Sequence, residues 1–421
     1  MPTKLLLFYV ACTMTYASSM TTIVHEAIEH NHKLKSYKYS IQAAFERVDL
    51  AKDQLWPSLN ASASIGKDKY YYNYPSGRID YDTKTTSYQI FLKQPIYRPK
   101  IFDLIKESKL KVRYAQIQKR DFINSLVRQV LGLYVDILYY HAIQILYSKQ
   151  IDNYNAILHE IKQKRALRFA TDTDMALAKA DLATAVSNKA QAQYTLQSLL
   201  HRLAIYIGKV PSVSASLHDS IKDFSISKLS IEHNPQLLLA KMDVQIAANE
   251  IKKRKKSFYP TLDLSASYGD TDSSDSITRR KNSRIFLELQ VPLFSKQNFD
   301  AIDEATYLYQ ASKQNFFDTK ERLRLQSINV YYNIISTKNL LQMDLSVIEA
   351  KKLYKKQALL SYRSSLISLS DLSKAINSLY DALIQKEYHK KELTKNLIEY
   401  FYLAGKLMKR YKQIDSFIIK E

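Results

Sequence analysis

Residues 56–65 read WPSLNASASI, and residues 259–268 repeat the pattern as YPTLDLSASY. In both stretches a proline ends a helical pattern, and apolar and polar residues then alternate. A period of two is typical of a strand with one apolar and one polar face. The stretches lie 203 positions apart (Pro57 to Pro260), which indicates that a structural unit occurs twice in this chain.

Further matched positions extend the repeat along the 421-residue chain. Residues 94–97 (QPIY) match residues 291–294 (VPLF) at an offset of 197, and Gly208 matches Gly405 at the same offset. The offset changes from 203 to 197 between the two proline-containing segments of each copy. We therefore expect the loop between those segments to be shorter in the second copy. The predicted organisation is a first repeat at 23–208, a connector at 209–230, a second repeat at 231–410 and a tail at 411–421.

The N-terminus, residues 1–17, has a charged start, a short apolar stretch and small residues at its end. This pattern predicts a secretory signal peptide; the alternative is a frayed cytosolic N-terminus. The single cysteine, Cys12, lies in this segment, and whether it carries a lipid stays open. No other stretch approaches the roughly 18 apolar residues that a membrane helix requires, so we expect no spanning helix.

Each copy is predicted to run helix, strand, loop, strand, long helix, turn, helix. The first helix is expected at about Ile23–Leu55. Hairpins are expected at 58–94 and 261–291, with strands of about 9–11 residues, the length of a tilted transmembrane strand. Polar loops are expected at Lys67–Lys84 and Asp270–Asn282.

Long helices are predicted where the chain has few residues that break helices. Residues 100–210 contain no proline, and neither do residues 293–421. We therefore expect long helices at about Pro99–Arg165 and Lys296–Tyr362, each followed by a turn and a second helix.

Four strands cannot close a barrel, and an open sheet edge in lipid would leave backbone groups without hydrogen bonds. If the strands lie in a membrane, several chains must therefore contribute strands to one barrel. The alternative is a pair of soluble hairpins on a helical protein.

Two short segments point to a known family. Tyr362-Arg363-Ser364-Ser365 followed by residues 379–382 (LYDA), and Thr173-Asp174-Met175 in the first copy, resemble the helix-tip motifs of the TolC family of outer-membrane efflux and secretion channels. The resemblance covers about residues 23–410.

This resemblance implies a mainly α-helical fold with a transmembrane β part. It implies a homotrimer whose twelve-stranded barrel lies in outer-membrane lipid of a Gram-negative cell and continues as a coiled-coil tunnel across the periplasm. The implied function is an exit duct of a tripartite efflux pump or a type I secretion system. An inner-membrane pump and a periplasmic adaptor would be its partners, and conduction would be passive.

The tip residues depart from the family pattern in several places. Arg168 and Ser365 stand where the motif has glycine, and Ile367 stands where well-studied members carry a gating arginine. The resemblance makes Asp371 a candidate constriction ring, with an N-cap of the following helix as the alternative role.

Three more residues complete the candidate gate. Asp174 and Tyr362 are a candidate latch between helices, although Asp174 has the same alternative as a cap. Lys374 stands where some members have a second aspartate. It either pairs with Asp371, which would weaken an anionic ring, or points into solvent.

Residues 252–256, KKRKK, form a basic run before the second strand pair. We predict that they lie near anionic head groups or in the tunnel lining, the alternative being a solvated helix face.

Two other classes of protein fit part of the sequence. One is a coiled-coil surface scaffold or adhesin-like protein, and the alternating strands argue against it. The other is a nucleic-acid binder, suggested by the net charge of +21, and the export signal argues against it. Patterns typical of phosphate loops, nucleophile elbows and metal ligands are missing from the sequence, so we expect no enzyme activity, no cofactor and no metal.

Overall fold

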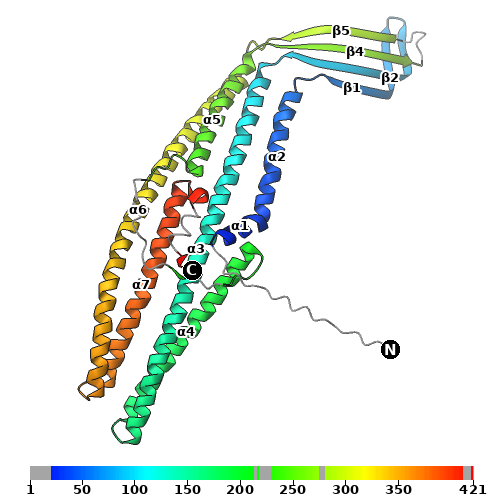
Figure 1. Ribbon diagram of the computed structural model, residues 1–421. Coiled ribbons are helices and arrows are strands. Elements are labelled where there is room, and N and C mark those ends of the chain that lie inside the picture. The colour runs from blue at the N-terminus through cyan, green and yellow to red at the C-terminus, as the bar shows by residue number, and fades with distance from the viewer. Residues whose placement is uncertain (1–19, 213–215, 218–228, 275–279, 411–418, 421) are drawn as a thin grey trace, which may run out of the picture. The chain divides into compact units, whose positions relative to one another are not determined.

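The computed structural model describes residues 20–212, 216–217, 229–274, 280–410 and 419–420. The predicted signal peptide and almost all of the predicted tail lie outside these residues. The elements and their bounds, drawn in Figure 1, are α1 (Met20–His30), α2 (His32–Asp53), β1 (Ser58–Tyr74), β2 (Gly77–Tyr97), α3 (Pro99–Ala166), α4 (Asp172–Ile207), β3 (Ser216–Leu217), α5 (Pro235–Lys255), a 3-10 turn η1 (Lys256–Phe258), β4 (Thr261–Ser273), β5 (Arg280–Gln290), α6 (Lys296–Arg363), α7 (Leu369–Leu403) and β6 (Ile419–Lys420).

The chain forms two compact units, and each predicted repeat contributes to both. The strand unit comprises residues 36–118 and 238–319, and the tip unit comprises residues up to 35, 119–237 and from 320 onward. The strand unit therefore holds the four long strands with the helices directly attached to them. The tip unit holds α4, α7 and the distal parts of α3 and α6.

The strand unit contains one antiparallel sheet in the order β1-β2-β4-β5. β1, β2 and β4 are longer than the predicted 9–11 residues, with 17, 21 and 13 residues, whereas β5 has 11 residues as predicted. The predicted loop at Lys67–Lys84 is wrong, because these residues continue the β1–β2 ladder as far as the pair Tyr74 and Gly77. The predicted loop at 270–282 is also too long, because β4 extends to Ser273 and β5 begins at Arg280.

The missed strand residues have a physical explanation. Residues 70–72 are three successive tyrosines, which interrupt the alternation in the outer part of β1, whereas residues 78–82 of β2 do alternate and were a signal that the sequence interpretation missed. The ladder there is supported by cross-strand charge, since Lys67 Nζ lies 2.8 Å from an Asp82 carboxylate oxygen.

The helices follow the prediction with two corrections. The expected single helix at Ile23–Leu55 is divided at Asn31, whose Oδ1 accepts a hydrogen bond of 3.1 Å from the Leu34 amide and so starts a new helix. α3 and α6 have 68 residues each, and both end one residue beyond the predicted bounds. α3 also contains an 18-residue window of mean hydropathy 1.3, which by length and composition alone would suit a membrane span. The expectation that no stretch approaches this length is therefore wrong, although core helices pass the same test.

A glycine that lies against a histidine ends both repeats in the tip unit. Gly208 and Gly405 have positive φ angles of 79° and 65°. A Cβ on Gly208 would lie 2.5 Å from the His30 ring, and a Cβ on Gly405 would lie 2.2 Å from the His233 carbonyl oxygen. The positive φ angle favours glycine at both positions, and at Gly405 the nearby backbone carbonyl also leaves no room for a Cβ.

Candidate site at the helical tips

Two turns in the tip unit join long helices to the helices that return along them, α3 to α4 and α6 to α7 (Figure 1). In the first turn the Phe169 amide donates to the Lys164 carbonyl at 2.7 Å, and in the second the Leu366 amide donates to the Ser361 carbonyl at 2.8 Å. This hydrogen bond is the signature of a Schellman motif, which needs a left-handed residue just before its donor.

Arg168 and Ser365 occupy that left-handed position. Their φ angles are +63° and +59°. The departure of both residues from the family's glycine therefore changes the side chain and leaves the turn conformation intact. Left-handed backbone is unfavourable for side chains other than glycine, so both turns carry local strain.

Both aspartates of the predicted site are built into helix caps. Thr171 caps α4, and its hydroxyl and amide both donate to Asp174 Oδ2, at 2.7 and 3.0 Å. Ser368 caps α7, and its hydroxyl donates to Asp371 Oδ2 at 2.7 Å. The alternative prediction made each aspartate the N-cap itself, whereas the N-caps are Thr171 and Ser368 and each aspartate is the third residue of its helix. These bonds orient the carboxylates at the tips.

The electrostatic surroundings of the two carboxylates differ. Lys374 Nζ lies 3.2 Å from Asp371 Oδ1, one turn along the same helix. The pKa of Asp371 is lowered by the hydrogen bond from Ser368 and then by Lys374. In the first copy the position of Lys374 is taken by Leu177, which packs against an apolar cluster. The Asp371 carboxylate is thus partly neutralised by a pairing that Asp174 does not receive from this position.

That apolar cluster joins the two helical hairpins behind their turns. Its most deeply buried members include Ile161 of α3 and Leu372, Ala375 and Ile376 of α7. Its remaining buried members are Tyr154, Ile157, Met175, Ala178, Ala185, Ala358, Tyr362, Leu369 and Tyr380. Burial of these side chains holds the four helices together, so the tips are fixed relative to each other in this structure.

Tyr362 lies in this cluster and is only 9% exposed. Lys164 Nζ lies 4.2 Å from the centre of its ring, in a cation–π contact. Burial raises the pKa of Tyr362, and the nearby charges of Asp174 and Glu160 raise it further. In the described part of the chain no hydrogen bond joins Asp174 to Tyr362. The negative charge of Asp174 therefore acts on the Tyr362 hydroxyl through space.

Polar contacts between the hairpins were missed by the sequence interpretation. The Tyr154 hydroxyl donates to Asn377 Oδ1 at 2.6 Å, and Asn153 Nδ2 donates to the Tyr380 hydroxyl, also at 2.6 Å. Lys355 Nζ donates to Asn153 Oδ1 at 2.7 Å. Amide side chains on helix faces that are otherwise apolar were the available signal, because buried polar groups need partners.

Large apolar side chains are exposed at the turns themselves. Leu167, Phe169 and Leu366 are 67%, 81% and 77% exposed. Among the described residues, no three histidine, cysteine, aspartate or glutamate side chains lie together in a way that could hold a metal ion.

The model of the family described as outer membrane efflux protein matches residues 23–209 and 226–405 of this chain. The chain belongs to this family. Outer membrane protein TolC of Escherichia coli K12 is 24% identical over 411 residues, which cover 88% of this efflux protein and 78% of TolC. The alkaline protease secretion protein AprF of Pseudomonas aeruginosa is 25% identical over 271 residues, which cover 60% of this chain and 55% of AprF.

Solved structures show the same fold. The outer membrane protein VceC of Vibrio cholerae superposes with a TM-score of 0.79 at 15% identity, covering 92% of this chain and 96% of VceC. This efflux protein is therefore an outer-membrane channel protein for efflux or secretion, mainly α-helical with a β part. Solved structures with this fold include proteins described as outer-membrane channels.

Proposed function

We propose that three copies of this chain form one conduit, with twelve strands in a barrel in the outer membrane and the helices as a periplasmic tunnel. Residues 23–208 and 231–410 are then two copies of one unit, so that the tunnel wall has six similar sectors. The observation that carries the proposal is the open sheet. Among the residues that the structure describes, β1 and β5 each have a strand neighbour on one side only, and in lipid their free edges require partners.

The side chains of the sheet support a membrane location. Ile65, Ile285, Leu287 and Leu289 are between 64% and 82% exposed, although they are large and apolar. Trp56 and Tyr259, directly before the two strand pairs, are 71% and 48% exposed. Apolar outward side chains bordered by aromatic residues are typical of membrane barrels.

The tip supports the rest of the proposal. Its exposed apolar side chains suit contact with a periplasmic adaptor and an inner-membrane pump, which would supply the energy for passive conduction through this chain. In a threefold channel Asp371 would form a ring of three carboxylates, each partly neutralised by Lys374. Asp174, Tyr362 and Lys164, with Arg168 at the turn, would stabilise the closed arrangement of the hairpins.

The oligomer is tested by fractionation. Outer-membrane fractions run on mildly denaturing gels should show trimers that dissociate on heating. Recovery of the protein only from the soluble periplasm would rule out the channel.

The role of Asp371 is tested in planar bilayers. Asp371→Ala should raise single-channel conductance or alter block by cations, because it removes the carboxylate ring. Asp172→Ala is the control, since it removes an exposed carboxylate from the first turn of α4 that has no part in the proposed gate. Equal conductance and equal cation block in Asp371→Ala and the unaltered channel would reduce Asp371 to a helix cap.

A further inference from the structure

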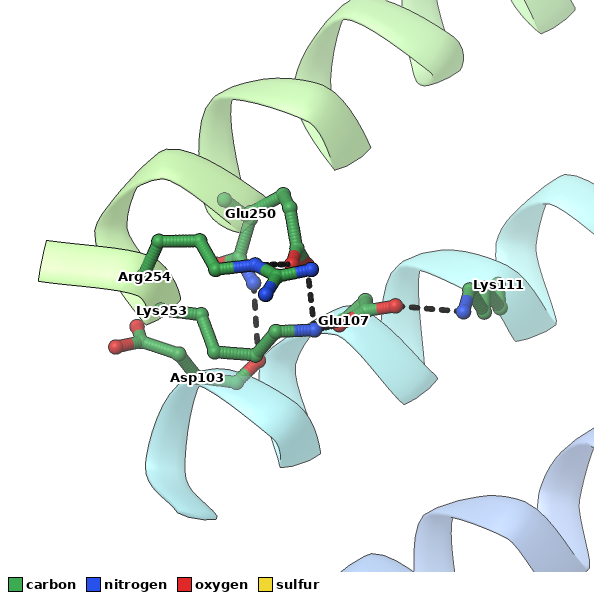
Figure 2. Close-up of polar contacts among 7 residues, drawn as sticks. Asp103, Glu107, Lys111, Glu250, Lys253 and Arg254 are labelled. Carbon is green, nitrogen blue, oxygen red and sulfur yellow. Dashed lines mark hydrogen bonds and ion pairs between the residues drawn. The ribbon is translucent and has the colours of Figure 1, made fainter. Parts of the chain in front are cut away.

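An acid–base network joins α3 to α5 in the strand unit (Figure 2). Glu107 of α3 accepts from Lys253 of α5 at 2.6 Å and pairs with Lys111 at the same distance. Asp103 lies 2.6 Å from Lys256, and Arg254 pairs with Glu250 at 2.7 Å. Two residues of the basic run at 252–256, Lys253 and Lys256, thus join this segment to α3, which neither of its predicted roles included.

The network is partly buried. Asp103 and Glu107 are each 7% exposed, and Asn249 Nδ2 donates to the Asp103 carbonyl oxygen at 2.9 Å. Burial on its own would raise the pKa of Glu107, but the hydrogen bonds from Lys111 and Lys253 outweigh it and lower the pKa. A buried carboxylate such as that of Glu107 is stabilising only while Lys111 and Lys253 neutralise it.

The order of the strands explains why α3 meets α5. β2 is the neighbour of β4 in the sheet, α3 begins directly after β2, and α5 ends directly before β4. In the proposed trimer β5 of one protomer becomes the neighbour of its partner's β1. α6 follows β5 and α2 precedes β1, so α6 would then meet the partner's α2 in the same way.

We propose that the seam between protomers is a copy of the β2–β4 and α3–α5 seam in which the acid–base network has been lost. This inference rests on the proposed trimer and specifies its contacts. Positions on β2 and α3 map to β5 and α6 by adding 197, and positions on β4 and α5 map to β1 and α2 by subtracting 203. Both offsets come from the repeat itself.

The mapping sets the strand register between protomers. Leu92 pairs with Ala266 inside the chain, so Leu289 pairs with the partner's Ala63. By the same rule the adjacent pairs are Leu287 with the partner's Ile65, Glu288 with the partner's Ser64, and Gln290 with the partner's Ser62.

The faces of the two strands agree with this register. Apolar residues lie opposite apolar residues, and polar residues lie opposite polar ones. A shift by one residue would place Leu289 opposite the partner's Ser62 or Ser64 and would turn an entire face over.

The same mapping reverses the charge of the helical seam. Inside the chain, the eight positions 103, 107, 111, 249, 250, 253, 254 and 256 carry three carboxylates and four cations. Their counterparts at 300, 304, 308, 46, 47, 50, 51 and 53 carry four carboxylates and one cation. Asp103 with Lys256 becomes Asp300 with the partner's Asp53, and Glu107 with Lys253 becomes Glu304 with the partner's Leu50.

Two apolar residues replace two of the lost cations. Leu50 stands for Lys253 and Leu308 stands for Lys111, and within one chain they are 62% and 57% exposed. The seam between protomers would bury both leucines. Apolar burial would therefore hold the two helices together, while their carboxylates would repel each other. Lys296, which lies 3.3 Å from Asp300 in the same helix, moderates that repulsion.

The register is tested by disulfide trapping between protomers in outer-membrane fractions, with Cys12 replaced by alanine or serine. Residues directly opposite in an antiparallel pair have Cα atoms about 4.5–5.5 Å apart, within the range that a disulfide spans. Leu289→Cys with Ala63→Cys should therefore form covalent oligomers on denaturing gels without reductant. The controls combine Leu289→Cys with Ala61→Cys or Ile65→Cys, which keep the same face but shift the register by two.

The outcomes separate this inference from the proposed function. Stronger cross-linking in either shifted control would overturn the register while leaving the trimer in place. Failure of all three pairs, with a monomeric mass in detergent, would overturn the trimer as well. Failure of all three pairs in a protein that is still trimeric would overturn the β5–β1 contact alone.

The charge of the seam is tested by restoring the lost cation. Asp53→Lys reproduces the Lys256 position and should raise the dissociation temperature of the trimer by about 2–4 °C. Adding Asp300→Asn should remove most of that gain, because Asp300 is the intended partner. Asp49→Lys is the matched control, since it changes the net charge equally but lies at the position of the exposed Lys252. No gain in Asp53→Lys, or an equal gain with Asp300→Asn or in Asp49→Lys, would overturn the proposed seam.

Discussion

The two tip turns share one backbone and differ in their side chains. Each ends a 68-residue helix with a left-handed residue, Arg168 or Ser365, and each starts the next helix with a hydroxyl cap and an aspartate three residues later. Yet Asp371 has Lys374 beside it, whereas the first copy has Leu177 at that position. Local backbone rules therefore fix where the carboxylates lie, and the residue one turn later sets how much charge they present.

The apolar cluster behind the turns is also filled unequally. Ile161 of the first copy corresponds to Ala358 of the second, and both are buried there. One position of the repeat thus supplies a large side chain and its counterpart a small one. The two hairpins therefore fill the cluster with side chains of different size.

The largest effect is expected from removing that inequality. Ile161→Ala should lower the free energy of unfolding by about 2–5 kcal/mol, because it leaves a cavity at a fully buried position. Thermal unfolding followed by circular dichroism of the purified protein measures the loss. Ile205→Ala, at a site that is 83% exposed, is the control and should change little. A similar small change in Ile161→Ala would contradict the packing described for the cluster.

A smaller effect is expected from removing the helix caps. Thr171→Ala and Ser368→Ala should each cost about 1 kcal/mol, since each leaves helix amides without an acceptor. Because each hydroxyl accepts a hydrogen bond from the amide three residues later, the two losses in thermal stability should be similar. A loss at only one turn would show that the backbone equivalence does not extend to energetics.

Replacing each left-handed residue by glycine should raise the free energy of unfolding by about 0.5–1 kcal/mol at that turn. Arg168→Gly and Ser365→Gly keep the turn and remove the unfavourable side chain. The melting temperature should therefore rise in both variants and rise further in the double variant. Arg168→Ala keeps a Cβ and serves as the control, which should show no comparable gain.

The smallest effect is expected from pH at the second turn. The pKa of Asp371 is lowered from its ordinary value of 3.8 by Ser368 and Lys374. Its contribution to stability is therefore fully present above pH 3.8 and is lost as the pH falls through the lower pKa of the folded state. Proteolysis of the turn by an acid protease between pH 5 and about 2 should show this loss. Asp371→Asn should flatten the pH dependence, and an unchanged profile would contradict it.

Much of this architecture could be predicted from sequence, for reasons that particular residues illustrate. The scarcity of proline and glycine predicted α3 and α6 to within one residue, because those two residues are the strongest helix breakers. The strands were predicted only where one face is apolar, as at Leu59 to Ile65. Their outer ends were taken for loops, because three successive tyrosines at residues 70–72 interrupt the alternation in β1 and the alternation at residues 78–82 of β2 was overlooked.

Other features depended on contacts between distant residues. The division at Asn31 arises from a side chain that competes for helix amides, and the same residue type occurs inside many helices. The Glu107–Lys253 pair joins residues far apart in the chain, and nothing local marks either as a partner. The basic run was visible in sequence, but its use was not, since that depends on which helix lies beside it.

The left-handed turns have a practical consequence for spectroscopy. Positions 168 and 365 already tolerate side chains other than glycine, and the chain has one native cysteine, Cys12, which lies in the predicted signal peptide. A spin label at Ser365→Cys would therefore report from the end of the tunnel with little disturbance of the backbone. In a trimer the three labels would form an equilateral triangle, whose side length would measure how far the tips separate when the channel opens.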